Sequence, residues 1–318
     1  MSDLRELRLL EQQFFRAPSA HNTQPWLLDY SPAEVGLRFD PERALPLGDP
    51  TRRDLFLSLG ALVEAVLIAS AAAGLAVEFR TDLDEETRVG SFVRATASYR
   101  TSFDPGDLEH RRTSRLAYEP GRLADDDLRA ARRELGTEEM LSEVSGAEIV
   151  DLYVQADRHL YDSPEVVEEL RSWLRLSRRH SRAAQDGLSR DCLALGRAEA
   201  LAFAFMLRPR VYPLVRFLRL HRTFTRSTTS LVERGSILML AGPARTPETL
   251  LDHGRSLLRV WLALGRRGYY THPLSQILDD PMTEHELASR LALGDETRLL
   301  SVFRVGRSAQ PSRSARLV

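Results

Sequence analysis

The chain contains no lysine and only one cysteine, and each scarcity excludes a class of chemistry. All 44 basic residues are arginine, so no lysine can form a Schiff base with a carbonyl substrate. The single cysteine, Cys192, cannot form an intrachain disulfide, and no signal-peptide pattern is recognisable. This usage predicts a reducing, cytoplasmic location.

Several common functional motifs are also missing. The sequence has no Gly-x-Gly-x-x-Gly or Walker loop for nucleotides and no Gly-x-Ser-x-Gly elbow of serine hydrolases. Its eight histidines are scattered without metal-ligand spacing, so no metal site is expected. The net charge of −1 gives no excess of positive charge for binding nucleic acid, and no apolar run approaches a membrane span. Neither nucleic acid nor a membrane is therefore expected as a partner.

The local charge is far less balanced than the total. Residues 171–226 carry thirteen arginines against Asp186, Asp191 and Glu199, a balance of 13 − 3 = +10. Such a stretch could attract a phosphate-bearing ligand, such as a cofactor or a nicotinamide nucleotide.

Hydrophobic periodicity and turn residues predict a chain of mixed helices and strands. With 318 residues and a 43% hydrophobic fraction, it can bury a large core. Helices are expected at 3–15, 53–73, 124–135 and 249–264, with a helix-rich region at 164–230. Strands are expected twice within 27–39, at 76–80, near 93–99, at 149–154, at 236–241 and from Tyr269 onward.

One pattern occurs twice in the chain. The apolar helix 53–73, its glycine turn and the strand at 76–80 are echoed by the helix 249–264, a glycine turn and the strand from Tyr269. The similarity is one of pattern and not of residue identity. It predicts two related half-units in one chain.

The most informative segment is Pro18-Ser19-Ala20-His21-Asn22-Thr23-Gln24-Pro25-Trp26. Pro18 would end the preceding helix, while Ser19 and Asn22 could present short polar side chains and backbone groups to a flat polar ring. Gln24 and Trp26 would support the turn from inside. The alternative is that Ser19 or Asn22 caps the next element and Trp26 is ordinary core.

A second segment, Arg111-Arg112-Thr113-Ser114-Arg115, carries closely spaced cations. On a strand, Arg111, Thr113 and Arg115 would face the same way and could grip a phosphate with two guanidinium groups and a hydroxyl. The alternative is a solvated turn before a helix.

The first of these segments resembles the flavin-contacting Pro-Ser-x-x-Asn-x-Gln-Pro-Trp loop of the FMN-dependent nitroreductase family. Ordinary members are homodimers in which each chain opens with an Arg-x-Ser/Thr-x-Arg/Lys strand and then carries this loop. Here the first half has only the loop and the second half only the Arg111 strand. This split resembles the Acg-like branch, in which one chain mimics the dimer and keeps one flavin site.

The resemblance covers nearly the whole chain and implies an α+β nitroreductase-like fold, a mixed sheet flanked by helices, as an intramolecular pseudo-dimer. It implies a first half at 1–105 that supplies the Pro-Ser loop, a second half at 106–318 that grips the FMN phosphate, and a helical lid-like insertion at about 171–230. A monomer is expected. The residues implied to bind FMN are Pro18, Ser19, Ala20, Asn22, Arg111, Thr113, Arg115, His272, Pro273, Leu274, Arg313 and Arg316.

The implied activity is hydride transfer between NAD(P)H or an organic small-molecule substrate and the flavin. No catalytic side chain is expected, and His21 and His272 are interpreted as packing residues. Two other interpretations stay open for the insertion. A lid over residues 173–230 could block the nicotinamide and leave an FMN-sequestering protein, or it could shape a pocket for a specialised substrate. A structural protein that has lost the flavin is a third interpretation.

Overall fold

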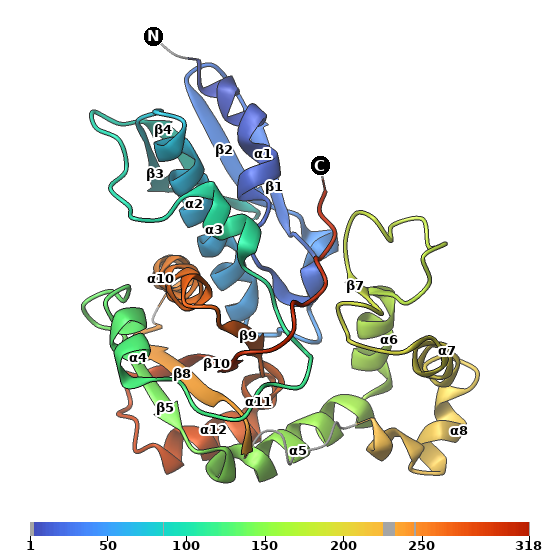
Figure 1. Ribbon diagram of the computed structural model, residues 1–318. Coiled ribbons are helices and arrows are strands. Elements are labelled where there is room, and N and C mark those ends of the chain that lie inside the picture. Colours follow the sequence, from blue (N-terminus) through green and yellow to red (C-terminus); the bar gives the residue numbers. More distant parts are fainter. Residues whose placement is uncertain (1–2, 85, 225–232, 245, 318) are drawn as a thin grey trace.

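The computed structural model describes residues 3–84, 86–224, 233–244 and 246–317, and these form an α+β protein with two separate four-stranded sheets. Two long helices, α2 and α10, cross between the sheets at the centre of the molecule (Figure 1). A helical insertion extends from the second sheet on one side.

The first sheet is built from the first hundred residues. Its strands lie in the order β1-β2-β4-β3, and every neighbouring pair is antiparallel. The elements are η1 (Leu4–Leu10), α1 (Glu11–Phe14), η2 (Ala20–Asn22), β1 (Trp26–Tyr30), β2 (Glu34–Phe39), η3 (Pro41–Arg43), α2 (Arg53–Ala72), β3 (Val77–Thr81) and β4 (Arg88–Arg94).

The second sheet has the strand order β5-β8-β10-β9, again antiparallel throughout. Its elements are α3 (Pro105–His110), α4 (Asp125–Arg132), β5 (Met140–Val144), β8 (Ser236–Gly242), α10 (Pro247–Arg266), β9 (Tyr270–Pro273), α11 (Gln276–Asp279), α12 (Pro281–Arg290) and β10 (Arg298–Gly306). The insertion between β5 and β8 contains α5 (Gly146–Asp162), α6 (Pro164–Ser172), β6 (Leu174–Arg175), β7 (Leu188–Ser189), α7 (Arg197–Met206), α8 (Tyr212–Phe217) and η4 (Leu220–Thr223).

The two sheets share one connectivity. Each is made by two strands, a helix of 20 residues and two further strands, and each places its strands in the order first, second, fourth, third. The repeated pattern in the sequence therefore corresponds to two units with the same topology.

The two long helices meet through a pair of glycines. A Cβ atom on Gly60 would lie 2.0 Å from the carbonyl oxygen of Leu251, and one on Gly254 would lie 2.2 Å from the carbonyl oxygen of Leu57. Counted from Arg53 and Pro247, each glycine is the eighth residue of its helix and each carbonyl belongs to the fifth. The contact is therefore reciprocal, as in a two-fold interface.

Several expectations about the secondary structure are wrong. The main sheets are antiparallel and not mixed; among the described residues, parallel pairing occurs only between β6 and β7 and at two isolated bridges. The expected strand at 149–154 lies inside α5, because Ser145 and Glu148 form a capping box that starts a helix. The strand expected near 93–99 is β4, which begins earlier because its buried run starts at Val89.

The expectation that no apolar run approaches a membrane span is also wrong as stated. Helix α2 is long and apolar enough to cross a membrane, but 89% of its most apolar window is buried inside the protein. It packs against α10 and the first sheet and is therefore a core helix.

Candidate functional site

The Pro-Ser loop joins α1 to β1 in a tight, left-handed path. His21, Asn22 and Gln24 have φ angles of 47°, 57° and 53°, a region that asparagine enters more readily than most residues. The backbone N–H of Gln24 donates to Ser19 Oγ at 2.9 Å, which closes the loop. Gln24 and Trp26 are buried beneath it.

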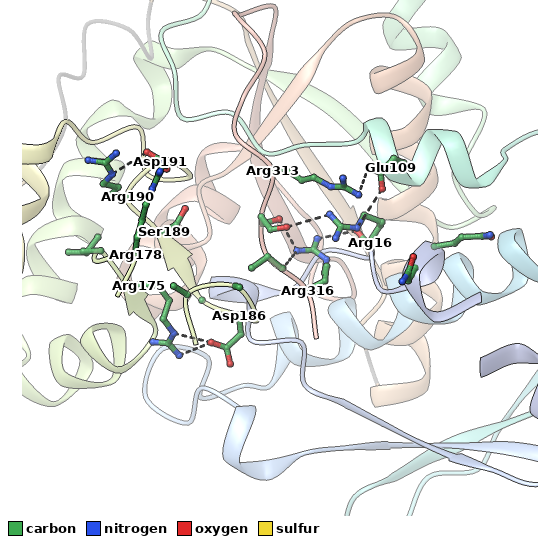
Figure 2. A pocket seen from close by; sticks show the side chains of 18 of the residues that line it. Arg16, Glu109, Arg175, Arg178, Asp186, Ser189, Arg190, Asp191, Arg313 and Arg316 are labelled. Carbon is green, nitrogen blue, oxygen red and sulfur yellow. Dashed lines mark hydrogen bonds and ion pairs between the residues drawn. The ribbon is translucent and has the colours of Figure 1, made fainter. Parts of the chain in front are cut away.

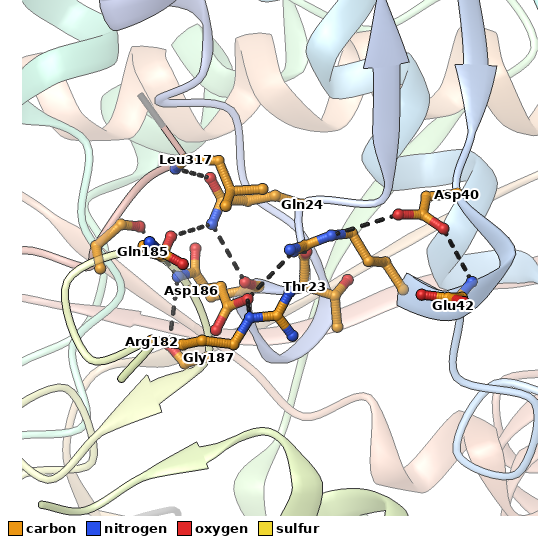
Figure 3. A network of polar contacts seen from close by, with 12 residues as sticks. Thr23, Gln24, Asp40, Glu42, Arg182, Gln185, Asp186, Gly187 and Leu317 are labelled. Atoms are coloured by element: carbon orange, nitrogen blue, oxygen red, sulfur yellow. Dashed lines mark hydrogen bonds and ion pairs between the residues drawn. The ribbon is translucent and has the colours of Figure 1, made fainter. Parts of the chain in front are cut away.

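This loop contacts both the insertion and the C-terminal tail (Figure 3). The Gly187 N–H donates to the Asn22 carbonyl at 3.2 Å, and Asn22 Nδ2 donates back to the Gly187 carbonyl at 3.3 Å. Gln24 Nε2 donates to the Gln185 carbonyl at 2.9 Å, and Gln24 Oε1 accepts from the Leu317 N–H at 2.9 Å. The loop is therefore covered by two segments that lie far away in the sequence.

The segment 111–115 is extended, but it is not the regular strand expected from its alternation. It touches the free edge of β9 through one parallel bridge between Thr113 and Thr271, and the Ser114 N–H donates to the Thr271 carbonyl at 2.9 Å. Arg111 and Arg115 consequently turn toward different neighbours. Arg111 Nη2 donates to the Arg16 carbonyl at 3.3 Å, whereas Arg115 Nη1 donates to the Cys192 carbonyl in the insertion at 3.3 Å.

Two buried arginines, Arg111 and Arg316, and the half-buried Arg16 gather where the loop, this segment and the tail meet. Arg316 Nη1 donates to Asn22 Oδ1 at 2.6 Å, and its Nη2 lies 3.3 Å from the Arg16 carbonyl that Arg111 also contacts. Within the described residues, no hydrogen-bond acceptor is found for Nε of Arg16, Nε of Arg316, or Nε and Nη1 of Arg111. These guanidinium groups are mostly satisfied by neutral carbonyls and leave buried donors unused.

The electrostatics of this arginine cluster (Arg16, Arg111 and Arg316) are unfavourable as they stand. Burial, and then the charge of Arg16, lowers the pKa of Arg111 to about 10. Burial, followed by the charges of Arg111 and Arg16, holds the pKa of Arg316 well below its ordinary value. Burial and the charge of Arg313 lower the pKa of Arg16 as well. Each shift would be relieved by a bound anion.

The carboxylate closest to the cluster is already shared. Glu109 on α3 forms a close ion pair with Arg313, and its Oε2 lies 3.7 Å from Arg16 Nε. Arg313 is therefore placed near the cluster but is half-exposed and partnered. On the opposite side, burial and then the charge of Arg115 lower the pKa of His21 to about 4, so His21 is neutral at pH 7.

The remaining predicted residues lie on β9 and at its end. Thr271 is buried, and no hydrogen-bond partner is found for its Oγ1 among the described residues. His272 and Pro273 pair with Arg304 and Phe303 of β10. The Leu274 N–H donates to the Val302 carbonyl at 2.8 Å, so this amide is already used within the protein.

A cavity of about 800 Å³ opens beside the arginine cluster (Figure 2). It lies between α1, the start of α3, the insertion loop 175–191 and the tail. Its charged lining residues are Arg16, Glu109, Arg175, Arg178, Asp186, Arg190, Asp191, Arg313 and Arg316, six cations against three acids. The volume is in the range of small-molecule and cofactor sites.

Tertiary structure thus brings together some of the predicted residues and adds others. Asn22, Arg111 and Arg316 lie together, and Thr113 lies beside β9, while Leu274 is in the core. Arg16 was not predicted, although it directly precedes Ala17-Pro18 and could have been noticed there. Arg112, which donates to the Pro311 carbonyl at 3.0 Å, was passed over because an ideal strand would turn it away.

The arrangement has the features of a site that could accept an anionic small molecule: buried guanidinium nitrogens without acceptors, beside a cavity. In the part of the chain that is described, no group of three or more His, Cys, Asp or Glu residues could hold a metal ion. The unused, buried guanidinium donors suit a phosphate, which accepts several charge-assisted hydrogen bonds.

Comparison with curated proteins gives a distant relationship by sequence. A probable NAD(P)H nitroreductase, PigM, from Serratia is 25% identical over 316 aligned residues, which span 90% of this chain and 83% of that protein. A putative NAD(P)H nitroreductase, Rv3131, from Mycobacterium tuberculosis is 32% identical over 170 residues, 50% of this chain and 48% of that protein. No family model matches the chain. The chain is therefore a distant relative of proteins named as NAD(P)H nitroreductases.

Solved structures show a weaker likeness. A nitroreductase with bound FMN from Bacteroides fragilis is 12% identical with a TM-score of 0.40, covering 65% of this chain and 89% of that one. The FMN-dependent nitroreductase NfnB from Mycobacterium smegmatis, in complex with NADPH, is 18% identical with a TM-score of 0.37, covering 64% and 86%. TM-scores of this size do not establish a shared fold, so the relationship rests on sequence.

Proposed function

We propose that the protein is an FMN-dependent oxidoreductase of the nitroreductase family, built as an Acg-like pseudo-dimer that accepts hydride from NAD(P)H. The distant sequence relationship to NAD(P)H nitroreductases supports the activity. The split of the Pro-Ser loop and the Arg111 segment between the two halves supports a single site.

The observation that carries the proposal is the buried arginine cluster. Four guanidinium nitrogens of Arg16, Arg111 and Arg316 are buried without an acceptor in the described residues. Leaving such donors unsatisfied costs about 1–3 kcal/mol each, and three adjacent cations repel one another. The dianionic phosphate of FMN would satisfy both demands.

The reciprocal glycine contact supports the pseudo-dimer. Two chains related by a two-fold axis would bring the same residues together from both sides, and Gly60 and Gly254 each approach the carbonyl of the partner helix's fifth residue. Because the second half-unit is already present in the chain, a cytoplasmic monomer with one flavin site is the proposed form.

In this assignment the chain binds and orients the FMN and keeps water away from it, and the cofactor does the redox chemistry. FMN, when bound, supplies hydride acceptance and hydride donation. Arg111, Arg316 and Arg16 would hold its phosphate, with Thr113 beside them. The Pro-Ser loop would border the ring, where neutral His21 adds no charge, and the cavity would admit the nicotinamide and the acceptor.

The proposal is tested by the visible spectrum of the purified protein, the amount of FMN released per chain, and anaerobic addition of NADH and NADPH. We expect one FMN per chain that bleaches on reduction. The double variant Arg111→Ala with Arg316→Ala, which removes two guanidinium groups of the cluster, should lose FMN while staying folded. The matched control Arg122→Ala removes an exposed arginine that pairs with Glu143 of β5, and this variant should keep FMN. A double variant that retains FMN as tightly as the parent would show that the phosphate grip is assigned wrongly.

A second candidate function, FMN sequestration without turnover, is favoured by one observation. The polar groups of Asn22 and Gln24 bond to residues 185–187 and to the tail, so the insertion covers the loop as a lid. Asp186 anchors this lid: it is buried and pairs with Arg175 at 2.8 Å and with Arg43 at 3.3 Å.

Asp186→Asn should loosen the lid and separate the two candidates. If the lid blocks turnover, the variant should retain FMN and be reduced by NADPH at least about tenfold faster than the parent, since a loss of about 1.4 kcal/mol of lid closure suffices. If the lid shapes a working pocket, reduction should stay equal or slow down. Stopped-flow absorbance under anaerobic conditions measures both outcomes.

A further inference from the structure

The tip of the insertion exposes an unusual amount of apolar side chain. Helices α7 and α8 and the turn after them stand at the outer edge of the molecule, beyond α6 and away from both sheets (Figure 1). Six large apolar side chains here are exposed, from 44% for Leu220 to 83% for Phe217. This apolar patch consists of Leu201, Phe205, Leu214, Phe217, Leu218 and Leu220.

The patch is not simply poor packing of a small module. The inner side of the same helices forms its own core, in which Leu207, Tyr212 and Val215 are buried. Helix α7 is apolar on its outer side as well, where Leu201 and Phe205 lie one turn apart. A helix that is apolar all round is ordinarily covered on all sides, and contiguous exposed apolar surface marks an interaction site.

The charges closest to the patch in sequence are mostly positive, although Glu199 lies in α7 and Asp162 pairs with His221 at 2.9 Å. Residues 200–224 contain five arginines and no acidic residue. Within the described part of the chain, no ion pair is found for Arg208, Arg210, Arg216, Arg219 or Arg222, although arginines elsewhere are widely paired. The Arg208 guanidinium lies 5.3 Å from the centre of the Phe205 ring, so cation and apolar group occupy the same surface.

We infer that this apolar and arginine-rich tip, residues 201–222, docks the protein on the surface of an anionic phospholipid membrane. Protruding Phe and Leu side chains beside arginines match the headgroup boundary, where the rings enter the acyl region and the cations meet phosphates. These arginines belong to the basic stretch 171–226, for which the sequence alone suggested a phosphate-bearing ligand and not a membrane.

A second copy of the chain is a poorer occupant of the same surface. A two-fold contact through the tip would place the five arginines of each copy against the same five of the other, and like charges across an interface are strongly disfavoured.

The test is flotation of the full-length protein with vesicles of phosphatidylcholine alone or of phosphatidylcholine with phosphatidylglycerol. We expect binding only to the anionic vesicles, and binding that weakens with salt. Arg208→Gln, Arg210→Gln and Arg219→Gln together should weaken partitioning roughly 100-fold, since each cation contributes roughly fivefold. Phe205→Ser with Phe217→Ser should also weaken it roughly 100-fold, at roughly tenfold for each ring.

The control Leu9→Ser removes an equally exposed leucine, 82% accessible, on the far side of the first half and should leave binding unchanged. All variants should keep the parent's thermal midpoint and flavin content, because the changed side chains are exposed. Absence of vesicle binding, or equal binding to both vesicle types, overturns the inference. So does capture of poly-glutamate in place of vesicles, which would indicate an acidic protein partner. Self-association by light scattering that Phe217→Ser abolishes would instead indicate a second copy.

Discussion

The two half-units share a topology but differ in what their connections carry. Between its first two strands, the first sheet has only the turn 31–33, while the second sheet has the whole insertion 145–235. The Pro-Ser loop belongs to the first half, and the Arg111 segment to the second. The strands and the central helices are thus alike in the two halves, whereas the loops differ, and the proposed site would take one part from each half.

The central helices show the same contrast at the level of single residues. The eighth position is glycine in both, but the twelfth is Glu64 in α2 and Leu258 in α10. Glu64 is fully buried and accepts from Arg255 at 3.0 Å and Arg259 at 3.1 Å across the crossing. A symmetric backbone contact therefore carries an asymmetric charge contact, which specifies how the halves face each other.

The reciprocal contact between α2 and α10 can be disrupted by adding one methyl group to either glycine. Gly60→Ala and Gly254→Ala each place a Cβ about 2 Å from a backbone carbonyl, so both should destabilise by about 3 kcal/mol or more. Chemical unfolding followed by circular dichroism measures the two values. Effects that differ strongly between the two variants would contradict the reciprocal contact.

The charge contact between α2 and α10 is tested by changing Glu64. Glu64→Gln removes the charge that Arg255 and Arg259 share but keeps the shape of the side chain. In the parent, the Tyr99 hydroxyl donates to Glu64 Oε1 at 2.6 Å, and the amide oxygen of Gln can accept the same bond. Because both arginines can partly reach solvent, the expected loss is about 2 kcal/mol, below the usual cost of breaking a fully buried pair. Leu258→Gln, at the matching position of the other helix, should cost at least as much through lost packing. A neutral result for Glu64→Gln would mean that the ion pairs do not hold the halves together.

A buried His253–Glu139 pair occurs in the second half alone and makes stability depend on pH. Burial opposes the charge of His253, but the bonds to Glu139 and the Pro243 carbonyl raise its pKa above 6.5. Burial likewise opposes the charge of Glu139, but hydrogen bonds from His253 and Gly136 lower its pKa below 4.5.

The pair's contribution should therefore be complete between pH 4.5 and 6.5. It falls as pH rises through the folded pKa of His253, and it falls as pH drops through that of Glu139. His253→Gln should lower stability by about 1–2 kcal/mol at pH 6 and flatten the profile between pH 6 and 8, measured by denaturant titration. A profile that keeps the parent's slope would exclude the pair as its source.

The smallest expected effect is a gain in stability and not a loss. Gly265 lies in α10 like Gly254, but a Cβ there would meet no atom within 4 Å. Gly265→Ala should therefore stabilise the protein by up to about 1 kcal/mol through helix propensity. In α10, a change from glycine to alanine is thus expected to destabilise the protein at Gly254, in the crossing, and to stabilise it at Gly265, near the helix end. Thermal melts of the two variants compare these effects directly.

Local patterns predicted elements whose residues interact with near neighbours. The helices at α2 and α10, the hairpin of β1 and β2 and the strand β8 follow from periodicity and turn residues, and all are found. The prediction of a strand at 149–154 was wrong because an apolar run of that length suits either element, and the capping box at Ser145 decides for a helix. Strand β10 was not predicted, although Gly294-Asp295 before its apolar run and Gly306 at its end are turn signals that could have bounded it.

By itself, the sequence determined the repeat, the Pro-Ser loop and the presence of closely spaced arginines at 111–115, because each is a property of adjacent residues. Only the tertiary structure decided which cations meet. Arg16 and Arg316 are 300 positions apart and come together because the tail runs back across the Pro-Ser loop. Which of their nitrogens are buried without an acceptor depends on how distant segments pack, and packing of that kind has no local signature in the chain.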